Sequence, residues 1–319
     1  MTRYAKSYVL GCCLLCLLFK SYSQRSYRPK LAEFAVEKLS DHRTPYTGEG
    51  MLNGNSQSDG DLLLKAKLAI PLVISDQRLI GLQLKHNQHR FIFNHADYEG
   101  NSDIFGELEN RTFYNSAVRF LYREQLTPFK SLTFLGSLGI NNDQFKITPE
   151  ALNASASISY SVQRSSTEEI GFGLVASQTL GRFRALPLFT YENHFAPRWV
   201  IDLALPKSAA LRYIVDNRTF VTAKAEFKSN RYNLTDPLVG QYTDLTIRKL
   251  DLQWNLAFER EIHDWLWFSL EAGYNRNLLY TIVERGEATR DALIRLRPRD
   301  AAYMKASIFI VPPRKLFNR

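Results

Sequence analysis

Cysteine is almost absent from this chain. Its 319 residues include only three, and all of them (Cys12, Cys13 and Cys16) lie within the first 20 positions. The rest of the chain therefore cannot form a disulfide, present a thiol nucleophile or bind a metal through sulfur. The chain is otherwise 45% hydrophobic and 23% charged, a composition that excludes wholesale disorder.

Long apolar runs are also missing after residue 23, where no segment approaches the roughly 18 residues that a membrane-spanning helix needs. The one apolar run, 8–19, follows a basic start and precedes Ser21-Tyr22-Ser23, small residues of the kind read by a signal peptidase. We therefore predict a cleaved signal peptide at 1–23 and a mature domain at 24–319. A lipoprotein signal ending at Cys12 is the weaker alternative, because almost no apolar segment would precede the acylated cysteine.

Charge of one sign is nowhere concentrated in a long run. The net charge is +9, and it falls to +6 once Arg3, Lys6 and Lys20 leave with the signal peptide. Acidic and basic residues are interspersed, and the basic cluster in 283–301 has no interleaved aromatic residues on which bases could stack. Nucleic acid is therefore not an expected partner, whereas lipid phosphates could bind this loop.

What the chain has instead is strict alternation of apolar and polar residues. The clearest segments are 62–72, 152–163, 221–228 and 249–259. Successive side chains of a strand point to opposite faces, so each segment has one apolar and one polar face. A soluble sandwich would also give this pattern, but these segments run to about 10–16 residues and soluble strands to about 5–6. Together with the export signal, the pattern predicts an all-β, transmembrane antiparallel up-and-down β-barrel.

The links between these segments alternate in length. Short links are expected at 75–78, 126–129, 165–168, 195–198, 215–218 and 262–264, and long ones at 40–60, 95–106, 141–150, 233–244 and 283–301. Links 181–183 and 206–208 occupy positions where the alternation calls for long links, but both are short. This layout predicts about 14 strands, from 32–39 to 302–311. Twelve strands is the alternative, because the first segment and 209–215 are weak.

If the apolar face meets lipid, the opposite face lines the lumen. The charged residues predicted there are Lys65, Lys67, Lys85, Arg111, Arg119, Arg123, Arg212, Lys224, Glu226, Lys228, Lys249, Asp251, Glu259, Glu271 and Lys305, with Asp202 beside them. Their balance is about six positive charges, which would concentrate small anions. The alternative is that these charges pair across neighbouring strands and fill a closed interior.

Aromatic residues lie near the expected strand ends, where amphipathic rings suit the two membrane interfaces. They are Tyr114, Tyr122, Tyr160, Tyr191, Trp199, Trp265, Tyr274 and Tyr280. As a set at both ends of many strands, they favour the barrel.

Catalytic patterns are lacking. The segment Leu135-Gly136-Ser137-Leu138-Gly139 resembles a nucleophile elbow, but it begins with leucine and lies within a strand. His86 and His89 are three residues apart, so a strand places them on opposite faces. His95, Asp97 and Asp103 share one predicted loop, a grouping that arises readily by chance. We expect no catalytic, cofactor or metal site, and hence no enzyme.

The runs 186–191 (Leu-Pro-Leu-Phe-Thr-Tyr), 197–199 (Pro-Arg-Trp) and 203–206 (Leu-Ala-Leu-Pro) carry a resemblance. With the export signal and the cysteine-free barrel, they resemble an uncharacterised, domain-of-unknown-function family of Gram-negative outer-membrane β-barrels. The resemblance extends over the mature chain and implies a fold and an outer-membrane location, but no activity. Its last strand departs from the usual terminal aromatic signal, because Phe317 is followed by Asn318 and Arg319.

Three functions remain open. The first is a passive channel or small-solute transporter with a net cationic lumen, and the second a structural or adhesion barrel that acts through its outer loops. The third and least favoured is an outer-membrane enzyme. The expected partners are outer-membrane lipids, periplasmic chaperones, the barrel-assembly machinery and a small anionic solute.

Overall fold

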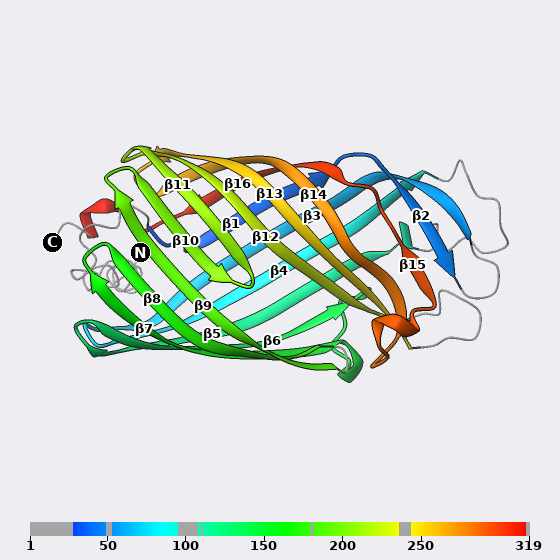
Figure 1. Ribbon diagram of the computed structural model, residues 1–319, viewed down its shortest axis with the longest axis horizontal. Coiled ribbons are helices and arrows are strands. Elements are labelled where there is room, and N and C mark those ends of the chain that lie inside the picture. The colour runs from blue at the N-terminus through cyan, green and yellow to red at the C-terminus, as the bar shows by residue number, and fades with distance from the viewer. Residues whose placement is uncertain are drawn as a thin grey trace, which may run out of the picture.

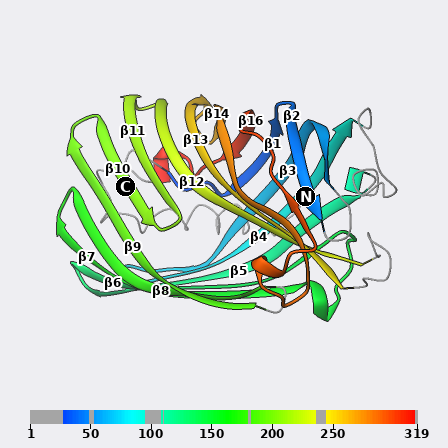
Figure 2. The same cartoon turned by 45° about the vertical axis from the view of Figure 1, so that its right-hand side comes forward.

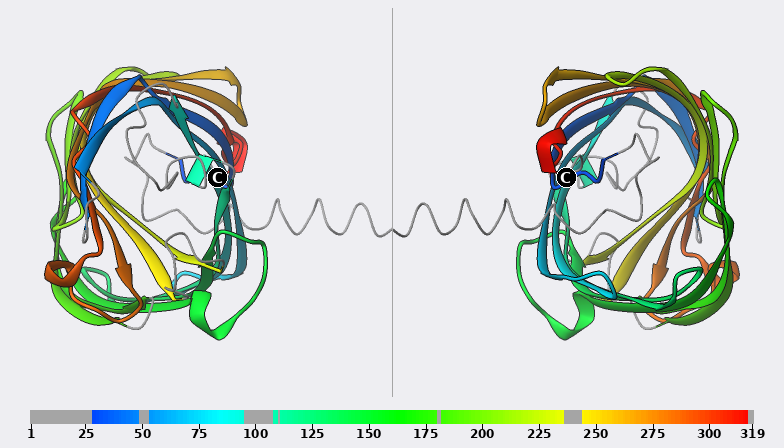
Figure 3. Two further views of the ribbon diagram at one scale, coloured as in Figure 1. Left: turned by 90° about the vertical axis from the view of Figure 1, so that its right-hand side faces the viewer. Right: turned by 90° about the vertical axis from the view of Figure 1, so that its left-hand side faces the viewer.

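The computed structural model describes residues 28–48, 53–94, 108–109, 111–179, 182–235 and 244–316. Most of them form antiparallel strands that wrap into one ring around a central lumen (Figure 1, Figure 3). The predicted signal peptide and the loop residues His95, Asp97 and Asp103 lie outside the described residues. In the described ranges no helix is both long enough and apolar enough to cross a membrane.

The secondary structure is almost entirely strand. The strands are β1 (Ala32–Leu39), β2 (His42–Gly48), β3 (Asn53–Ile74), β4 (Arg78–Asn94), β5 (Thr112–Thr127), β6 (Lys130–Asn142), β7 (Leu152–Ser165), β8 (Glu168–Thr179), β9 (Arg182–Ala196), β10 (Trp199–Leu205), β11 (Ser208–Asp216), β12 (Thr219–Leu234), β13 (Leu245–His263), β14 (Leu266–Glu284), β15 (Ile294–Leu296) and β16 (Ala301–Ile310). Short 3₁₀ turns are η3 (Pro149–Ala151), η4 (Thr289–Asp291) and η5 (Arg314–Leu316).

The ring closes through β1, which pairs with β16 along one edge and with β3 along the other. The other neighbours in the ring follow in chain order, with the short β15 passed over between β14 and β16, so the topology is up-and-down. The barrel has 14 strand positions, as the alternation predicted, and the 12-strand alternative is wrong. One end of the barrel carries the short links, such as 75–77, and is called the turn end; the other is called the loop end.

Two strand positions are each filled by two segments of chain. β3 pairs with β1 over the half nearer the turn end and with β2 over the half nearer the loop end. β14 pairs in the same way with β16 and β15. β2 and β15 pair with each other, so the wall continues to the loop end. The loop predicted at 40–60 is therefore largely strand, and the loop predicted at 283–301 contains the short strand β15. Polar residues in 40–60 and the arginines of 283–301 hid these strands from the alternation pattern.

The break between β1 and β2 sits opposite a bulge in β3 at Gly60. Gly60 has a φ of +103°, a conformation that other residues rarely adopt. A Cβ atom at this position would also overlap the backbone carbonyl of Leu39. Glycine at this position therefore lets β3 change partner from β2 to β1 without a clash.

The two faces of the wall differ as the alternation requires. Large apolar side chains such as Leu138 and Met304 are 64% and 71% exposed on the outside. Leu138 stands between Ser137 and Gly139, and Met304 is followed by Lys305 on the other face. An apolar belt of this kind matches lipid acyl chains, and the polar face then surrounds water or other polar groups.

The interface prediction for Tyr280 is wrong. Tyr160, Trp199 and Tyr274 are exposed on the outer surface, but Tyr280 is only 4% exposed and points into the lumen. The pairing of β13 with β14 shifts register between Leu250 and Asp251. This bulge reverses the side on which the following residues of β14 lie, and nothing in the local alternation reveals it.

The hairpin of β10 and β11 is much shorter than its neighbours (Figure 2). Its pairing ladders end at Phe189 of β9 and at Glu226 of β12, and both of these strands continue beyond the hairpin tip at 206–207. Beyond the tip, β12 reaches across to β6, where Asn233 pairs with Asn142. The loop end is therefore narrower than the middle of the barrel.

We predict that Gly60→Ala destabilises the barrel by about 1–3 kcal/mol through overpacking, in addition to the cost of the positive φ. Gly286→Ala is the matched control, because Gly286 also has a positive φ but open space around its Cβ position. Urea unfolding in detergent, followed by the heat-modifiable shift on gels, measures the difference. Equal loss in both variants would contradict the clash with Leu39.

Candidate functional site

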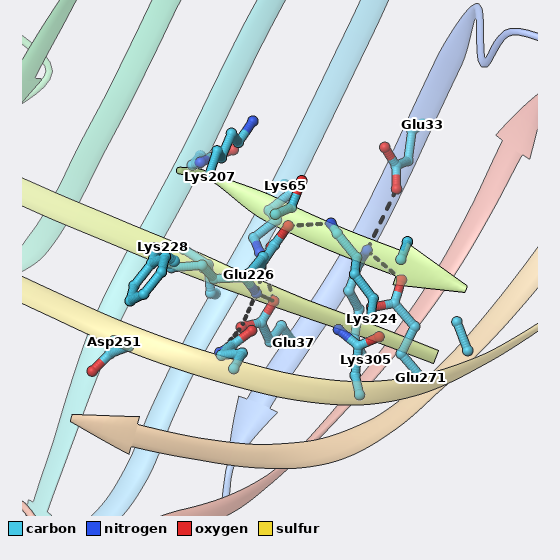
Figure 4. A pocket seen from close by; sticks show the side chains of 18 of the residues that line it. Glu33, Glu37, Lys65, Lys207, Lys224, Glu226, Lys228, Asp251, Glu271 and Lys305 are labelled. Atoms are coloured by element: carbon cyan, nitrogen blue, oxygen red, sulfur yellow. Dashed lines mark hydrogen bonds and ion pairs between the residues drawn. The ribbon is translucent and has the colours of Figure 1, made fainter. Parts of the chain in front are cut away.

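The barrel encloses a polar cavity of about 660 Å³. Its walls come from β1, β3, β4, β5 and β16 and from the strands β10–β14. The side chains that line it are mainly charged, and many of them point toward one another across the lumen (Figure 4). This cavity is the candidate functional site.

Glu37 of β1 is the centre of the most buried part of this network. It is 1% exposed and accepts hydrogen bonds from Lys65 Nζ at 2.5 Å, from Lys228 Nζ at 3.0 Å and from Gln253 Nε2 at 3.2 Å. Three strands distant in sequence thus meet on one carboxylate. Removing one member of such a buried ion pair leaves an uncompensated charge, which costs far more than the pair contributes.

Glu33 and Lys305 link the ring closure to the rest of the network. Lys67 Nζ lies 2.9 Å from Glu33, and Lys305 Nζ lies 2.7 Å from Glu271 and 3.6 Å from Glu33. Glu33 stands on β1 and Lys305 on β16, the two strands that form the seam of the ring. Charge pairing therefore reinforces the same seam that the backbone ladder closes.

Asp61 of β3 is the centre of a third group of charged residues, which lies nearer the loop end. It pairs with Lys249 and lies 3.3 Å from Nε2 of His89. The ammonium of Lys249 also lies over the rings of Phe91 and Tyr280, at 5.6 Å and 5.4 Å from their centroids. These rings belong to the apolar layer that follows, so Asp61 marks the boundary between the polar cavity and that layer.

The loop end of the lumen is closed by an apolar cluster, called the outer cluster. Its buried members are Tyr46, Phe91, Leu108, Phe113, Tyr232, Leu234, Leu245, Ile247, Tyr280, Ile282, Ile294 and Leu296. The cluster joins strands from both ends of the chain and from its middle. This apolar packing therefore lies between the polar cavity and the loop end.

A smaller cluster, Phe220, Trp267, Phe309 and Val311, lies at the turn end. Beside it, Arg28 donates to the carbonyl of Pro312 at 2.7 Å and pairs with Asp264 at 3.1 Å. The segments before β1 and after β16 are thus held to the same turn.

Of the fifteen charged residues predicted to line the lumen, all but Arg111 and Arg123 line this cavity. Arg123 lies nearer the turn end, 3.4 Å from Glu169. Arg111 precedes β5 and lies 2.8 Å from Asp143, beside the contact between β6 and β12. Asp202 also lines the cavity.

Five further charged residues line the cavity that the sequence reasoning missed: Lys30, Glu33, Glu37, Asp61 and Lys207. Glu33 and Glu37 alternate with Phe34 and Val36, so the pattern of the first strand contained the signal. Asp61 follows directly after the long link expected at 40–60, and Lys207 lies within the short link expected at 206–208. The lining therefore holds eleven lysine and arginine side chains against eight carboxylates, a smaller excess than predicted.

Histidines and acids do not gather into a metal site within the described ranges. His86 and His89 face opposite sides, as predicted: His86 contacts Ser116 at 2.7 Å, whereas His89 points to Asp61.

A family described as a domain of unknown function (DUF6268) matches residues 95–287. The chain belongs to this family. The DUF6268 match spans the strands from β5 to β14, and no curated protein matches the sequence.

Solved structures similar to this DUF6268 barrel are outer-membrane proteins. A deletion mutant of the TodX monoaromatic hydrocarbon channel has a TM-score of 0.45 and 8% identity, covering 90% of this chain and 91% of that one. A Pseudomonas aeruginosa FadL homologue has a TM-score of 0.44 and 10% identity, with coverages of 88% and 90%. An outer-membrane channel from Pseudomonas putida F1 has a TM-score of 0.41 and 9% identity, with coverages of 89% and 97%.

We predict that Glu37→Gln lowers the unfolding free energy of the barrel by about 3–5 kcal/mol, because Lys65 and Lys228 lose their buried counter-charge. Glu124→Gln is the control: it makes the same change in an exposed pair with Arg78, and should have little effect. Urea unfolding followed by tryptophan fluorescence compares the two. A Glu37→Gln protein as stable as the control would show that the network is not coupled to folding.

Proposed function

We propose that the protein is an outer-membrane channel or transporter for small solutes, with a lumen that favours anions, and that it reaches its location through the predicted signal peptide. The observation that carries this proposal is the charged cavity inside a barrel whose outer surface is apolar. A purely structural barrel has no need of a water-accessible cavity lined by ionised groups, because burying charge is costly.

The excess of cations in the lining supports the anion preference. Low-dielectric walls focus the field of lumen charges and raise the local concentration of counter-ions. Most lining carboxylates are already matched by a lysine, so the remaining positive charge is available to a passing anion. An enzyme is not favoured, because the described residues that line the cavity contain no catalytic constellation.

The outer cluster lies across the axial path, so we infer that the solute enters the cavity beside the short β10–β11 hairpin. Beyond the tip at 206–207, the cavity is lined by Phe227 and Ser229 as well as by Lys228 and Asn230. Neighbouring residues of a strand face opposite sides, so the cavity reaches both faces of β12 at this point. We infer that it opens through the wall between β9 and β12.

An alternative role as an adhesion or structural barrel rests on the outer loops. The seam strands β2 and β15 extend the wall past the first and last transmembrane strands, which gives loop segments a rigid base. No cavity is required for such a role, and conductance separates the two.

Protein extracted from the outer-membrane fraction should form conducting units in planar bilayers. Under a salt gradient, the reversal potential should have the sign of anion selectivity, because the lining has more cations than carboxylates. Heat-unfolded protein is the control. Cation selectivity would contradict the anion preference, and a lack of conductance would favour the loop-based role.

The side opening predicts how introduced cysteines behave, since the native cysteines all lie in the predicted signal peptide. Ser229→Cys, which lines the cavity beyond the hairpin tip, should react with a charged thiosulfonate and lose conductance. Ala223→Cys is the control, because Ala223 lies on the outer face between paired strands. If Ser229→Cys is modified and conducts normally, solutes take another path.

A further inference from the structure

Three cations of the cavity stand apart from its ion-pair network: Lys85 of β4, Arg119 of β5 and Lys207 at the tip of the β10–β11 hairpin. Lys85 Nζ donates to the amide oxygen of Asn115 at 3.0 Å, and Arg119 donates to that of Gln83 at 3.3 Å. In the part of the chain that the structure describes, no carboxylate forms an ion pair with any of the three. Figure 4 shows Lys207 away from the linked pairs.

These three cations are close enough to repel one another. Arg119, Lys67, Lys65 and Lys207, all positive, are among the charges that act on Lys85. Arg119 and Lys67 act on Lys207 as well. Since Lys85 and Arg119 come from one wall and Lys207 from the hairpin, the cluster has members on two sides of the cavity.

One carboxylate, Glu226, is also near Lys207. It is already engaged: it pairs with Lys224 and lies 3.8 Å from Lys228. The Glu37 and Glu33 carboxylates are likewise held by Lys65, Lys228 and Lys67. These carboxylates are therefore already paired with other lysines, and no carboxylate within the described residues forms an ion pair with Lys85.

Clustered like charges in a confined, low-dielectric space raise the free energy of the empty site. An anion that enters relieves this repulsion and gains charge-assisted hydrogen bonds, so the same arrangement that costs stability favours binding. The amide partners Asn115 and Gln83 orient the two wall cations without neutralising them.

We propose that Lys85, Arg119 and Lys207 form a binding site for a small organic carboxylate, beside the opening at the hairpin tip. The guanidinium of Arg119 offers the planar pair of donors that matches a carboxylate, and the two ammonium groups are free to turn to it. Because the cations lie on two sides of the cavity, a molecule with a carboxylate at each end suits the site. The site rests on the proposed function in one respect: the solute must be able to enter the cavity.

Calorimetric titration of the purified full-length protein in detergent tests the site without requiring transport. Succinate is the probe, and succinamide, which has the same shape without charge, is its control. We expect saturable succinate binding and none with succinamide. Lys85→Met, Arg119→Gln and Lys207→Met should each weaken binding about tenfold or more, the effect of losing one hydrogen bond to a charged group.

Arg123→Gln is the matched control variant. It removes the same charge from the inner face of the same strand as Arg119, but Arg123 lies outside the cavity lining. Its succinate affinity should stay within about twofold of the wild type. Lys85→Arg keeps the charge and should keep binding, which separates loss of the site from loss of folding. Lys207 lies in an exposed turn, so Lys207→Met should weaken binding without affecting folding.

No succinate binding by the wild-type protein, or equal weakening by Arg123→Gln, would overturn the site. Inorganic phosphate bound as tightly as succinate would overturn its assignment to carboxylates. Succinate binding by a protein that does not conduct would leave the site in place and remove the proposed channel. Anion-selective conductance without succinate binding would support the proposed channel and overturn the succinate site.

Discussion

The structure depends on one constraint: a chain surrounded by lipid must satisfy its backbone hydrogen bonds within itself. The ring of strands meets this demand even where β1 and β16 are interrupted. At these breaks the ladder is continued by single bonds, from Ser40 N to Ala302 O and from Arg299 N to Arg43 O, both 2.8 Å long. The wall is shortest at the β10–β11 hairpin, beyond whose tip Phe227 and Ser229 of β12 also line the cavity.

The interior follows from the same constraint. A closed wall with an apolar outside places its polar residues inside, and the charges there must find partners or water. Both partners and hydration are available to the charges of this cavity. Buried pairs such as Glu37 with Lys65 join the strands at the seam, whereas Lys85 and Arg119, on the nearby strands β4 and β5, donate to amide oxygens. The cavity thus has a neutralised part at the seam and a positive part beside it.

Much of this barrel could be predicted from local pattern alone. The alternation located the first and last wall strands to within about a residue, gave 14 positions and placed most of the lumen charges. Period-two patterning succeeds because lipid and lumen impose opposite demands on neighbouring residues.

What the pattern missed depends on contacts between segments distant in sequence. β2 and β15 are strands because each pairs with neighbours that are already in place; the alternation Ile-Arg-Leu of β15 is too short to predict a strand by itself. Tyr280 faces inward because of a bulge in the pairing of two strands, and a one-residue shift of this kind leaves no trace in either sequence. Lys207 belongs to the cavity because its hairpin is short relative to β9 and β12, a comparison that only the assembled wall permits.

The outer cluster also constrains the order in which the barrel can form. Tyr46 lies near the start of the chain, Leu234 beyond its middle and Ile294 near its end, yet the three belong to one apolar core. Such widely separated contacts carry a large loop-closure cost, so they are expected to form late. The core straddles the meeting of the first and last strands, and its burial of side chains gives that final joining a driving force of its own. Once the first and last strands have paired, reopening the ring would expose this apolar core, which makes reopening unfavourable.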